Sequence, residues 1–300
     1  MNVTVVITNY NYIDFVTDCV NSVLSQTYKE IEIIVIDDGS TDGSLDLLRE
    51  KYGFLSNLKI ISKENGGQLS AFNEAVKYIS GEIVCFLDAD DLYKQNYIEE
   101  IVKIYKQNEE VNFIFSAIEK FYPNGKIEII QKYPEDRPIG FSVISTLFAK
   151  EWIGSPTSAI SMKTSLLKKV LPIPFENEWI TRADDCLIWG SSILGAYKYY
   201  LSKPLVRYRI HYTNNYYGKI FSDEYLYQRE ISINRLFTHL INKSGISSQN
   251  LIDLINFEYR TRGDKSLNLL KLYLKILIKS NISFPLKFKK GLRLILDTIK

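Results

Sequence analysis

The first ninety residues alternate between short, continuous apolar runs and segments with a helical period. The apolar runs are rich in β-branched residues, as is typical of strands buried on both faces, and lie at Val3–Thr8, Ile31–Ile36, Leu58–Ser62 and Ile83–Leu87. Helical patterns separate them, at Phe15–Leu24, Ser44–Tyr52 and Leu69–Ile79. Short strand–helix–strand connections require right-handed crossovers. The sequence therefore predicts an α/β fold with a mostly parallel central sheet and helices on both faces.

Polar residues follow three of these apolar runs, at Thr8-Asn9-Tyr10-Asn11, Asp37-Asp38-Gly39-Ser40 and Asp88-Ala89-Asp90-Asp91. Ligands of open α/β sheets bind beyond the carboxyl ends of the strands. Carboxylates at i and i+2 can form an oxygen site for Mg²⁺ or Mn²⁺, and such a cation could neutralise a departing diphosphate. A carboxylate at the second motif can accept hydrogen bonds from a pyrimidine or a ribose. The alternatives are an acidic helix cap, a turn and an ordinary polar loop.

The rest of the chain has a looser pattern. Val111–Phe121 and Lys126–Ile130 predict a hairpin around Pro123-Asn124-Gly125. Further along, Thr157–Met162 and Leu205–Ile210 are expected to be extended, and Ala183–Leu194 helical. From about Ser222 the chain is expected to be helical, with breaks near 242–248 and 283–285.

Charge and cysteine usage limit the compartment and the partners. The net charge is +2, but residues 261–300 hold ten Lys/Arg against two Asp, so the first 260 residues carry −6. No nucleic-acid motif accompanies this charge, and nucleic acid is not an expected partner. The three scattered cysteines, and the absence of any run of about 18 apolar residues, indicate a cytoplasmic protein with reduced core cysteines.

The basic C-terminal segment leaves two interpretations open. Leu267–Ile278 is strongly apolar, and Lys271, Lys275 and the adjacent Lys279 are spaced four apart on one face. Such a helix can lie on an anionic membrane surface, which places the protein peripherally on the inner face of the plasma membrane. Alternatively, it packs on the preceding domain with its lysines in solvent.

Four runs in this order, VVITNYNY, QTYKEIEIIVIDDGSTDGS, ENGGQLSAFNEAV and GEIVCFLDADD, resemble the family 2 glycosyltransferases. The resemblance is close over 2–91 and extends to about Tyr216. It implies the GT-A fold, which is Rossmann-like, with a donor part at 1–91 and an acceptor part at 92–217, followed by a helical appendage at 218–300. It also implies a nucleotide diphosphate-sugar donor, usually a uridine one, and inversion by direct displacement.

The resemblance also implies residue roles. A divalent ion, Mn²⁺ or Mg²⁺, is expected at the DXD motif on Asp90, with Asp91 the competing ligand. The motif Tyr208-Arg209-Ile210-His211 places His211 near the diphosphate or the metal, although a lone histidine is often structural. The residues matched to the donor site are Thr8, Asn9, Tyr10, Asp37, Asp38, Asn65, Gly67, Gln68, Asn73, Asp88 and Ala89.

The catalytic base implied by the resemblance is an aspartate at the start of a helix. Aligning on Trp189 puts Asp185 at the base position and Asp184 where glutamate is usual, and which of the two acts stays open. The alternative is ordinary acidic charge at a helix N-terminus.

The resemblance thus implies transfer of a sugar, usually from a UDP-sugar, to a hydroxyl of a glycan or polyprenyl-linked glycan, and it implies a role in bacterial surface polysaccharide synthesis. Two alternatives are a non-catalytic nucleotide-sugar-binding module and a sugar-nucleotide nucleotidyltransferase. The latter would need a glycine-rich phosphate loop after the first strand, and Thr8-Asn9-Tyr10-Asn11-Tyr12 does not provide one.

Overall fold

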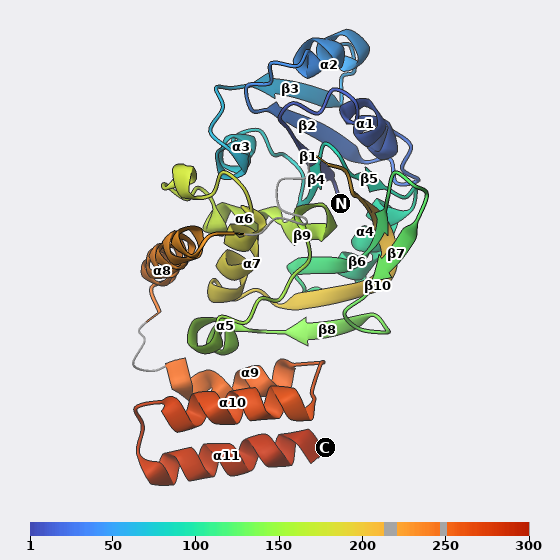
Figure 1. Ribbon diagram of the computed structural model, residues 1–300. Coiled ribbons are helices and arrows are strands. Elements are labelled where there is room, and N and C mark those ends of the chain that lie inside the picture. The colour runs from blue at the N-terminus through green and yellow to red at the C-terminus, as the bar shows by residue number, and fades with distance from the viewer. Residues whose placement is uncertain (213–220, 247–250, 300) are drawn as a thin grey trace.

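The computed structural model describes residues 1–212, 221–246 and 251–299 (Figure 1). Its strands are β1 (Val3–Asn9), β2 (Ile31–Asp37), β3 (Leu58–Ser62), β4 (Ile83–Asp88), β5 (Leu92–Tyr93), β6 (Phe113–Phe121), β7 (Ile127–Ile130), β8 (Arg137–Gly140), β9 (Ile160–Lys163) and β10 (Lys198–Arg209). Its helices are α1 (Val16–Leu24), α2 (Ser44–Tyr52), α3 (Gln68–Ala75), α4 (Tyr97–Gln107), α5 (Val143–Ala149), α6 (Thr164–Val170), α7 (Asp184–Ile193), α8 (Asp223–Ser244), α9 (Ile255–Thr261), α10 (Leu267–Lys279) and α11 (Phe284–Ile299).

One sheet of ten strands organises the fold. Its order is β3-β2-β1-β4-β9-β6-β10-β5, with β7 paired to β6 and β8 paired to β10. The first four strands in this order are parallel, β6 and β10 are parallel to each other, and β9 runs antiparallel between the two groups. The register pairs Asn9 with Asp37 and Thr8 with Asp88, so the ends of β1, β2 and β4 meet at one edge.

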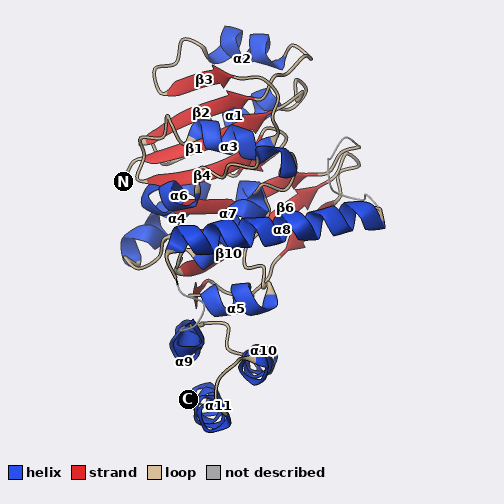
Figure 2. Ribbon diagram, turned by 90° about the vertical axis from the view of Figure 1, so that its left-hand side faces the viewer, coloured by secondary structure: helices blue, strands red, loops and turns tan. Residues whose placement is uncertain are grey.

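Helices cover both faces of the sheet because alternate residues of each buried strand point to opposite sides (Figure 2). In β1, Val6 faces a core formed with α3, α6, α7 and α8, whereas Val5 and Ile7 face a core formed with α1, α2 and α4. The three cysteines are free and buried, as expected of core residues. The predicted α/β architecture is confirmed.

Three predicted elements have different bounds. The extended segment expected at Thr157–Met162 begins as a 3₁₀ turn, Thr157–Ala159, and becomes β9 only at Ile160. Helix α3 ends at Ala75, four residues before its predicted end, because the following backbone tightens into i to i+3 hydrogen bonds. Strand β10 begins at Lys198 and shifts register between Leu201 and Val206, which bracket Pro204.

The C-terminal region is helical, as predicted. Helix α8 packs on the sheet domain through Ile233, Leu236, Phe237 and Leu240, whereas α9, α10 and α11 form a separate apolar cluster with α5. The first predicted break coincides with Gly245, which ends α8 with a φ of 67°. The second break lies at 280–283, between α10 and α11, so Phe284 and Pro285, which were expected within the break, belong to α11. The predicted boundary at residue 217, with Tyr216, lies outside the described residues.

Buried polar groups attach the last three helices to the sheet domain. Glu258 of α9 accepts hydrogen bonds from the backbone N–H groups of Ile144 and Ser145 at 2.7 and 3.0 Å, at the start of α5. Arg262 is 2% exposed and forms ion pairs with Glu151 and Asp264. Among the described residues, no helix combines the length and apolarity needed to cross a membrane.

Candidate active site

The three polar motifs meet where β1, β2 and β4 end. Thr8 Oγ1 donates to Asp88 Oδ1 at 3.0 Å, which connects the first motif to the third. Asn9 Nδ2 donates to Asp37 Oδ1 at 2.8 Å, which connects the first motif to the second. The parallel register therefore brings together residues that are up to 80 positions apart in the sequence.

Asn9 and Asp37 are buried beneath this edge. Besides Asp37, the Asn9 amide nitrogen contacts the hydroxyls of Ser40 and Ser44, and Asp37 Oδ2 accepts from the Ser40 N–H. The Asn9 side chain is 1% exposed and that of Asp37 is 0% exposed. Their hydrogen bonds to Ser40 and Ser44 hold the turn after β2 in place. A direct contact of either with a donor stays a prediction.

Asp38 organises the loop that leads into α3. Its carboxylate accepts from Lys63 Nζ at 2.7 Å, from Gly66 N at 3.0 Å and from Gly67 N at 2.7 Å, and Asn65 Nδ2 donates to its carbonyl at 3.0 Å. Gly67 has a φ of 84°, and a Cβ there would lie 2.4 Å from the Ile180 Cα. Only glycine fits at this contact with the segment before α7.

Gln68 connects the two acidic groups that the sequence singles out. Its Nε2 donates to Asp88 Oδ1 at 3.0 Å and to Thr157 Oγ1 at 3.1 Å, and its Oε1 accepts from the Ala183 N–H at 2.9 Å. Ala183 directly precedes Asp184 at the start of α7. One side chain thus fixes the distance between the motif after β4 and the proposed base.

The remaining predicted donor residues have different surroundings. The Asn73 amide makes three hydrogen bonds to Ile173 and Glu176, so it supports that loop. Ala89 is fully buried, and its backbone N–H donates to the Thr8 carbonyl. Tyr10 is 46% exposed at the edge of the site, where its ring is accessible to a ligand.

The carboxylates after β4 form a concentrated negative charge. Burial, followed by the charge of Asp90, raises the pKa of Asp88 to about 7. Burial and then the charges of Asp90 and Asp88 raise the pKa of Asp91 well above its usual range. Asp91 Oδ2 accepts from Ser158 Oγ at 2.6 Å, and Asp91 Oδ1 accepts from the Arg209 N–H at 2.8 Å. Both oxygens of Asp91 are therefore used within the fold.

The end of β10 brings His211 to this cluster. His211 Nε2 lies 2.9 Å from Asp90 Oδ2, and its ring packs against Phe15 and Tyr12 with centroid separations of 4.8 and 5.9 Å. Arg209 Nε donates to the Asp90 carbonyl at 2.8 Å. The sequence motif around Tyr208 therefore does lie beside the acidic one.

The residues present fit a divalent cation, although no three His, Cys, Asp or Glu side chains within the described ranges form a ready-made ion site. Asp90 and His211, which contact each other through Oδ2 and Nε2, offer one carboxylate and one imidazole, whereas both oxygens of Asp91 accept hydrogen bonds from Ser158 and Arg209. Two protein ligands would leave room for diphosphate oxygens and water, the arrangement that Mg²⁺ favours in nucleotide sites. The mutual repulsion of the three carboxylates is the feature that a cation would relieve.

The two aspartates at the start of α7 differ in accessibility. Asp185 is 0% exposed, accepts from Trp152 Nε1 at 2.6 Å, and pairs with Arg182 and Arg229. Asp184 remains partly exposed. Burial, followed by the charge of Asp185, raises the pKa of Asp184 to about 8, and the charge of Asp88 adds to this rise. Asp184 therefore shares an electrostatic environment with the motif after β4.

Sequence reasoning missed three residues of this site. Lys63 holds Asp38, whereas Trp152 and Arg229 hold Asp185. Lys63 lies 25 positions from its partner, Trp152 lies 33 and Arg229 lies 44. None of them lies in a local pattern that marks it. The pairing of β3 with β2 brings Lys63 to Asp38, whereas the docking of α8 and of the loop before Ile153 brings Arg229 and Trp152 to Asp185.

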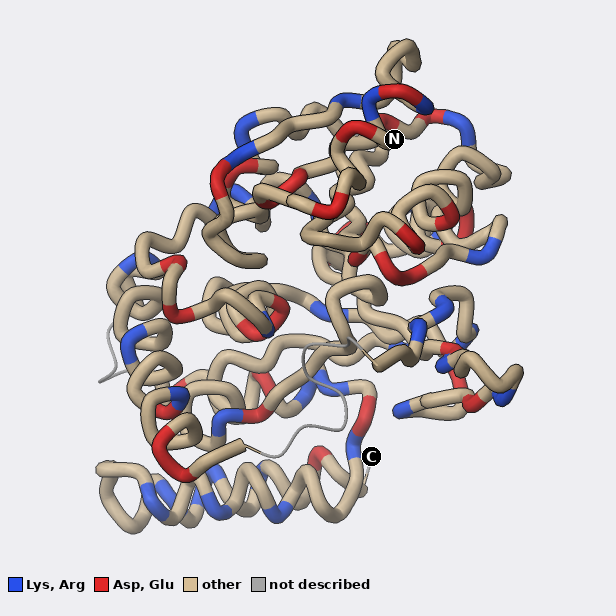
Figure 3. Tube along the Cα trace, turned by 45° about the horizontal axis from the view of Figure 1, so that its top comes forward, with Lys and Arg blue, Asp and Glu red and all other residues tan. Residues whose placement is uncertain are grey.

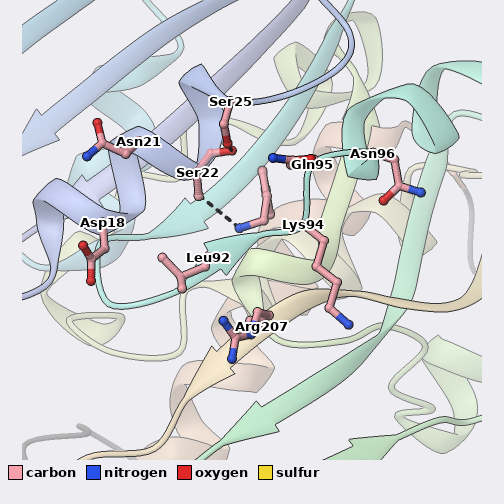
Figure 4. A pocket seen from close by; sticks show the side chains of 10 residues that line it. Asp18, Asn21, Ser22, Ser25, Leu92, Lys94, Gln95, Asn96 and Arg207 are labelled. Carbon is pink, nitrogen blue, oxygen red and sulfur yellow. Dashed lines mark hydrogen bonds between the residues drawn. The ribbon is translucent and has the colours of Figure 1, made fainter.

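An open pocket of about 710 Å³ beside the site is lined by residues of α1, of β5 with the segment after it, and of β10 (Figure 4). Arg207 and Lys94 line it, and both pair with Glu119, at 2.9 and 2.6 Å. None of the predicted site residues lines this pocket. The position of a donor is therefore inferred from the strand ends and not from the pocket.

Comparison with known proteins gives matches along much of the chain. The family model "Glycosyl transferase family 2" matches residues 4–170. An uncharacterized glycosyltransferase of Nostoc sp. is 34% identical over 72% of this chain and 67% of its own length. The chondroitin synthase of Pasteurella multocida is 31% identical over 42% of this chain. The matched segment is only 13% of that synthase and 14% of a similar relative, glycosyltransferase GlyA of Streptococcus pneumoniae.

Solved structures share the fold. S. aureus TarS 1–349, in complex with UDP-GlcNAc, superimposes with a TM-score of 0.62 at 19% identity, over 99% of this chain and 89% of that one. The mannosyltransferase PcManGT from Pyrobaculum calidifontis, in complex with GDP-Man and Mn²⁺, gives a TM-score of 0.55 at 18% identity, over 100% and 86% of the two chains.

Proposed function

The chain belongs to glycosyl transferase family 2 and is a glycosyltransferase, and from that premise we propose that it transfers a sugar from a nucleotide diphosphate to a hydroxyl with inversion. The observation that carries this proposal is the Gln68 bridge between Asp88 and the backbone N–H that precedes Asp184. It holds a carboxylate cluster suited to a diphosphate next to a carboxylate suited to a proton.

The proposed donor is a UDP-sugar bound over the ends of β1, β2 and β4. The accessible Tyr10 ring would stack on the base, and the loop that Asp38 organises would line the nucleotide. UDP-GlcNAc in the TarS complex supports this choice. GDP-Man in the PcManGT complex shows that the fold also accepts a guanosine donor, so GDP-sugars belong in any test.

Asp90 and His211 are the proposed metal ligands. A divalent ion there supplies Lewis-acid neutralisation of the leaving diphosphate. Asp91 has a positioning role, because it fixes Ser158 and the Arg209 backbone around the site. We therefore propose Asp90 rather than Asp91 as the ligand, because a carboxylate oxygen of Asp90 faces His211.

The proposed reaction is a single displacement. The acceptor hydroxyl oxygen forms a bond to the anomeric carbon while the bond from that carbon to the diphosphate oxygen breaks, and the diphosphate leaves with the electron pair. The hydroxyl proton passes to Asp184, the partly exposed aspartate whose raised pKa makes its carboxylate a stronger base than an ordinary aspartate. Asp185, which the alignment on Trp189 favours, is held by two arginines and an indole and is assigned a positioning role.

The proposed acceptor is a glycan or a polyprenyl-linked glycan, and the proposed context is surface polysaccharide synthesis in the bacterial cytoplasm, at the inner face of the plasma membrane. Relatives such as chondroitin synthase support a polysaccharide product. The free, buried cysteines suit a reducing compartment.

Thermal stabilisation by nucleotides tests the donor and metal assignments. We expect UDP or a UDP-sugar at about 100 times its Kd to add about 2.7 kcal/mol of stability, and a Tm rise of a few degrees that Mn²⁺ enlarges. Asp90→Asn should lose the Mn²⁺-dependent part, because it removes the charged ligand. The matched control is Asp46→Asn, the same change at an exposed position of α2. A protein that responds to no nucleotide, with or without Mn²⁺, would contradict the proposed donor site.

A further inference from the structure

The C-terminal helices differ in which apolar faces they bury. In α10, the helix with the strongest apolar run, Leu269, Tyr273, Ile276 and Leu277 pack inside the cluster shared with α5 and α9. Its lysines at 271 and 275 are exposed. The apolar face of α10 that packs in this cluster is not available to a membrane. The exposed surface of α10 combines these lysines with Leu267 and Ile278.

Helix α11 has the opposite arrangement. It buries only Gly291 and Leu294, and lies outermost in the molecule (Figure 1). Five of its exposed apolar residues recur every three to four positions and so share one face of the helix. These residues are Phe284, Phe288, Leu292, Ile295 and Ile299, and the first two are 79% and 66% exposed. We call this set the α11 stripe.

A basic pocket borders the α11 stripe. It has a volume of about 500 Å³ and is lined by Arg260 and Lys265 with Arg293, Leu296 and Asp297. Asp297 lies 4.0 Å from Arg260, and its backbone carbonyl accepts from Lys265. Three cations therefore face one carboxylate, and the pocket has an excess of positive charge. Leu296, about half exposed, connects the pocket to the stripe.

The charge of the surface identifies its occupant. Lys and Arg recur along the C-terminal helices, whose residues 261–300 carry a net charge of +8 (Figure 3). A second copy docked on the same face would bring an equally positive surface against this one, which is unfavourable. A bilayer that contains anionic lipids offers hydrocarbon to an apolar stripe and phosphate to a basic pocket at the same time.

We propose that α11 lies in the interface of an anionic membrane, with the α11 stripe among the acyl chains and the pocket of Arg260, Lys265 and Arg293 around a lipid phosphate. The helix would then hold the sheet domain beside the membrane. That position suits a lipid-linked acceptor, a consequence that rests on the proposed function.

Vesicle flotation of the full chain tests this proposal. The vesicles contain phosphatidylcholine alone or with phosphatidylglycerol, and wild type should bind the anionic ones preferentially. The stripe variant, Phe288→Ser with Leu292→Ser, should bind both kinds about tenfold more weakly or worse. The pocket variant, Arg260→Gln with Arg293→Gln, should bind anionic vesicles roughly 25-fold more weakly, because each basic residue near the surface contributes roughly a factor of five.

A matched control removes the same charge outside the pocket. Lys271→Gln with Lys275→Gln should weaken binding clearly less than the pocket variant does. An equal loss of vesicle binding in both variants would overturn the phosphate pocket. The proposal would also fail if inorganic phosphate displaced the protein from vesicles while the stripe variant bound as well as wild type. The proposed membrane contact would be wrong if wild type bound neither kind of vesicle. It would also be wrong if wild type were a dimer and the stripe variant a monomer. The nucleotide-dependent Tm shift of every variant reports on folding and on donor binding, so failure here is separable from failure of the proposed reaction.

Discussion

Replacing Asp184 with asparagine is expected to lower kcat by about 10²- to 10⁴-fold while the Kd of the donor stays within about threefold, the behaviour of a general base that is lost. Asparagine keeps the shape of the side chain but cannot accept the proton of the acceptor hydroxyl. Single-turnover kinetics with saturating donor, together with a direct measurement of donor binding, check both parts of this expectation.

The pH dependence of kcat/KM should report the ionisation of Asp184. Burial, followed by the charge of Asp185, raises the pKa of Asp184 to about 8, and a base must be unprotonated to act. Wild-type kcat/KM should therefore rise with pH until Asp184 has lost its proton, and this limb should be absent from Asp184→Asn. Because folding raises this pKa, stability falls as pH rises from the unfolded pKa to the folded one, a window in which Asp184 ionises in the unfolded chain but stays protonated in the native state. The variant should consequently be at least as stable as wild type at neutral pH.

Asp185→Asn is the comparison that decides between the two aspartates. The substitution removes the carboxylate that pairs with Arg182 and Arg229. If Asp185 has a positioning role, the Tm of Asp185→Asn should therefore be clearly lower than that of wild type. An Asp185→Asn protein that keeps its Tm and donor affinity but loses turnover, beside an active Asp184→Asn protein, would show that Asp185 is the base and that the alignment on Trp189 is right.

The sequence could predict the arrangement of the sheet edge because the information is local and periodic. Continuous apolar runs identify buried parallel strands, and the residue after each run then has to lie at the carboxyl edge. The meeting of Thr8 with Asp88 and of Asn9 with Asp37 follows from register alone. The approach of His211 to Asp90 follows from a motif, since periodicity does not place the end of β10.

The sequence could not predict contacts that depend on how distant helices dock. Arg229 reaches Asp185 from α8, and nothing around Arg229 in the chain indicates that partner. The C-terminal helices show the same limit, because the sequences of α10 and α11 both mix bulky apolar residues with lysines. Only packing shows that α10 has its apolar face covered and that α11 does not.

Arg262→Met is expected to lower the free energy of unfolding by about 3–5 kcal/mol at neutral pH, the usual effect of removing one partner of a buried ion pair. Arg262 is almost fully buried and forms two hydrogen bonds to Glu151 and two to Asp264. Methionine fills part of the volume but leaves both carboxylates without a cation. Chemical denaturation of the two proteins measures the difference.

The pH dependence separates this ion-pair effect from a simple packing defect. Burial alone would raise the pKa values of Glu151 and Asp264, but the hydrogen bonds and charge of Arg262 hold them below the usual range. A lowered folded pKa stabilises the native state above the unfolded pKa, and this stability is lost as pH falls through the folded value. The gap between wild type and Arg262→Met should therefore narrow as pH falls below about 4. A gap that stays constant from neutral to acidic pH would mean that methionine disturbs packing and that the ion pairs contribute little to the attachment of α9 to the sheet domain.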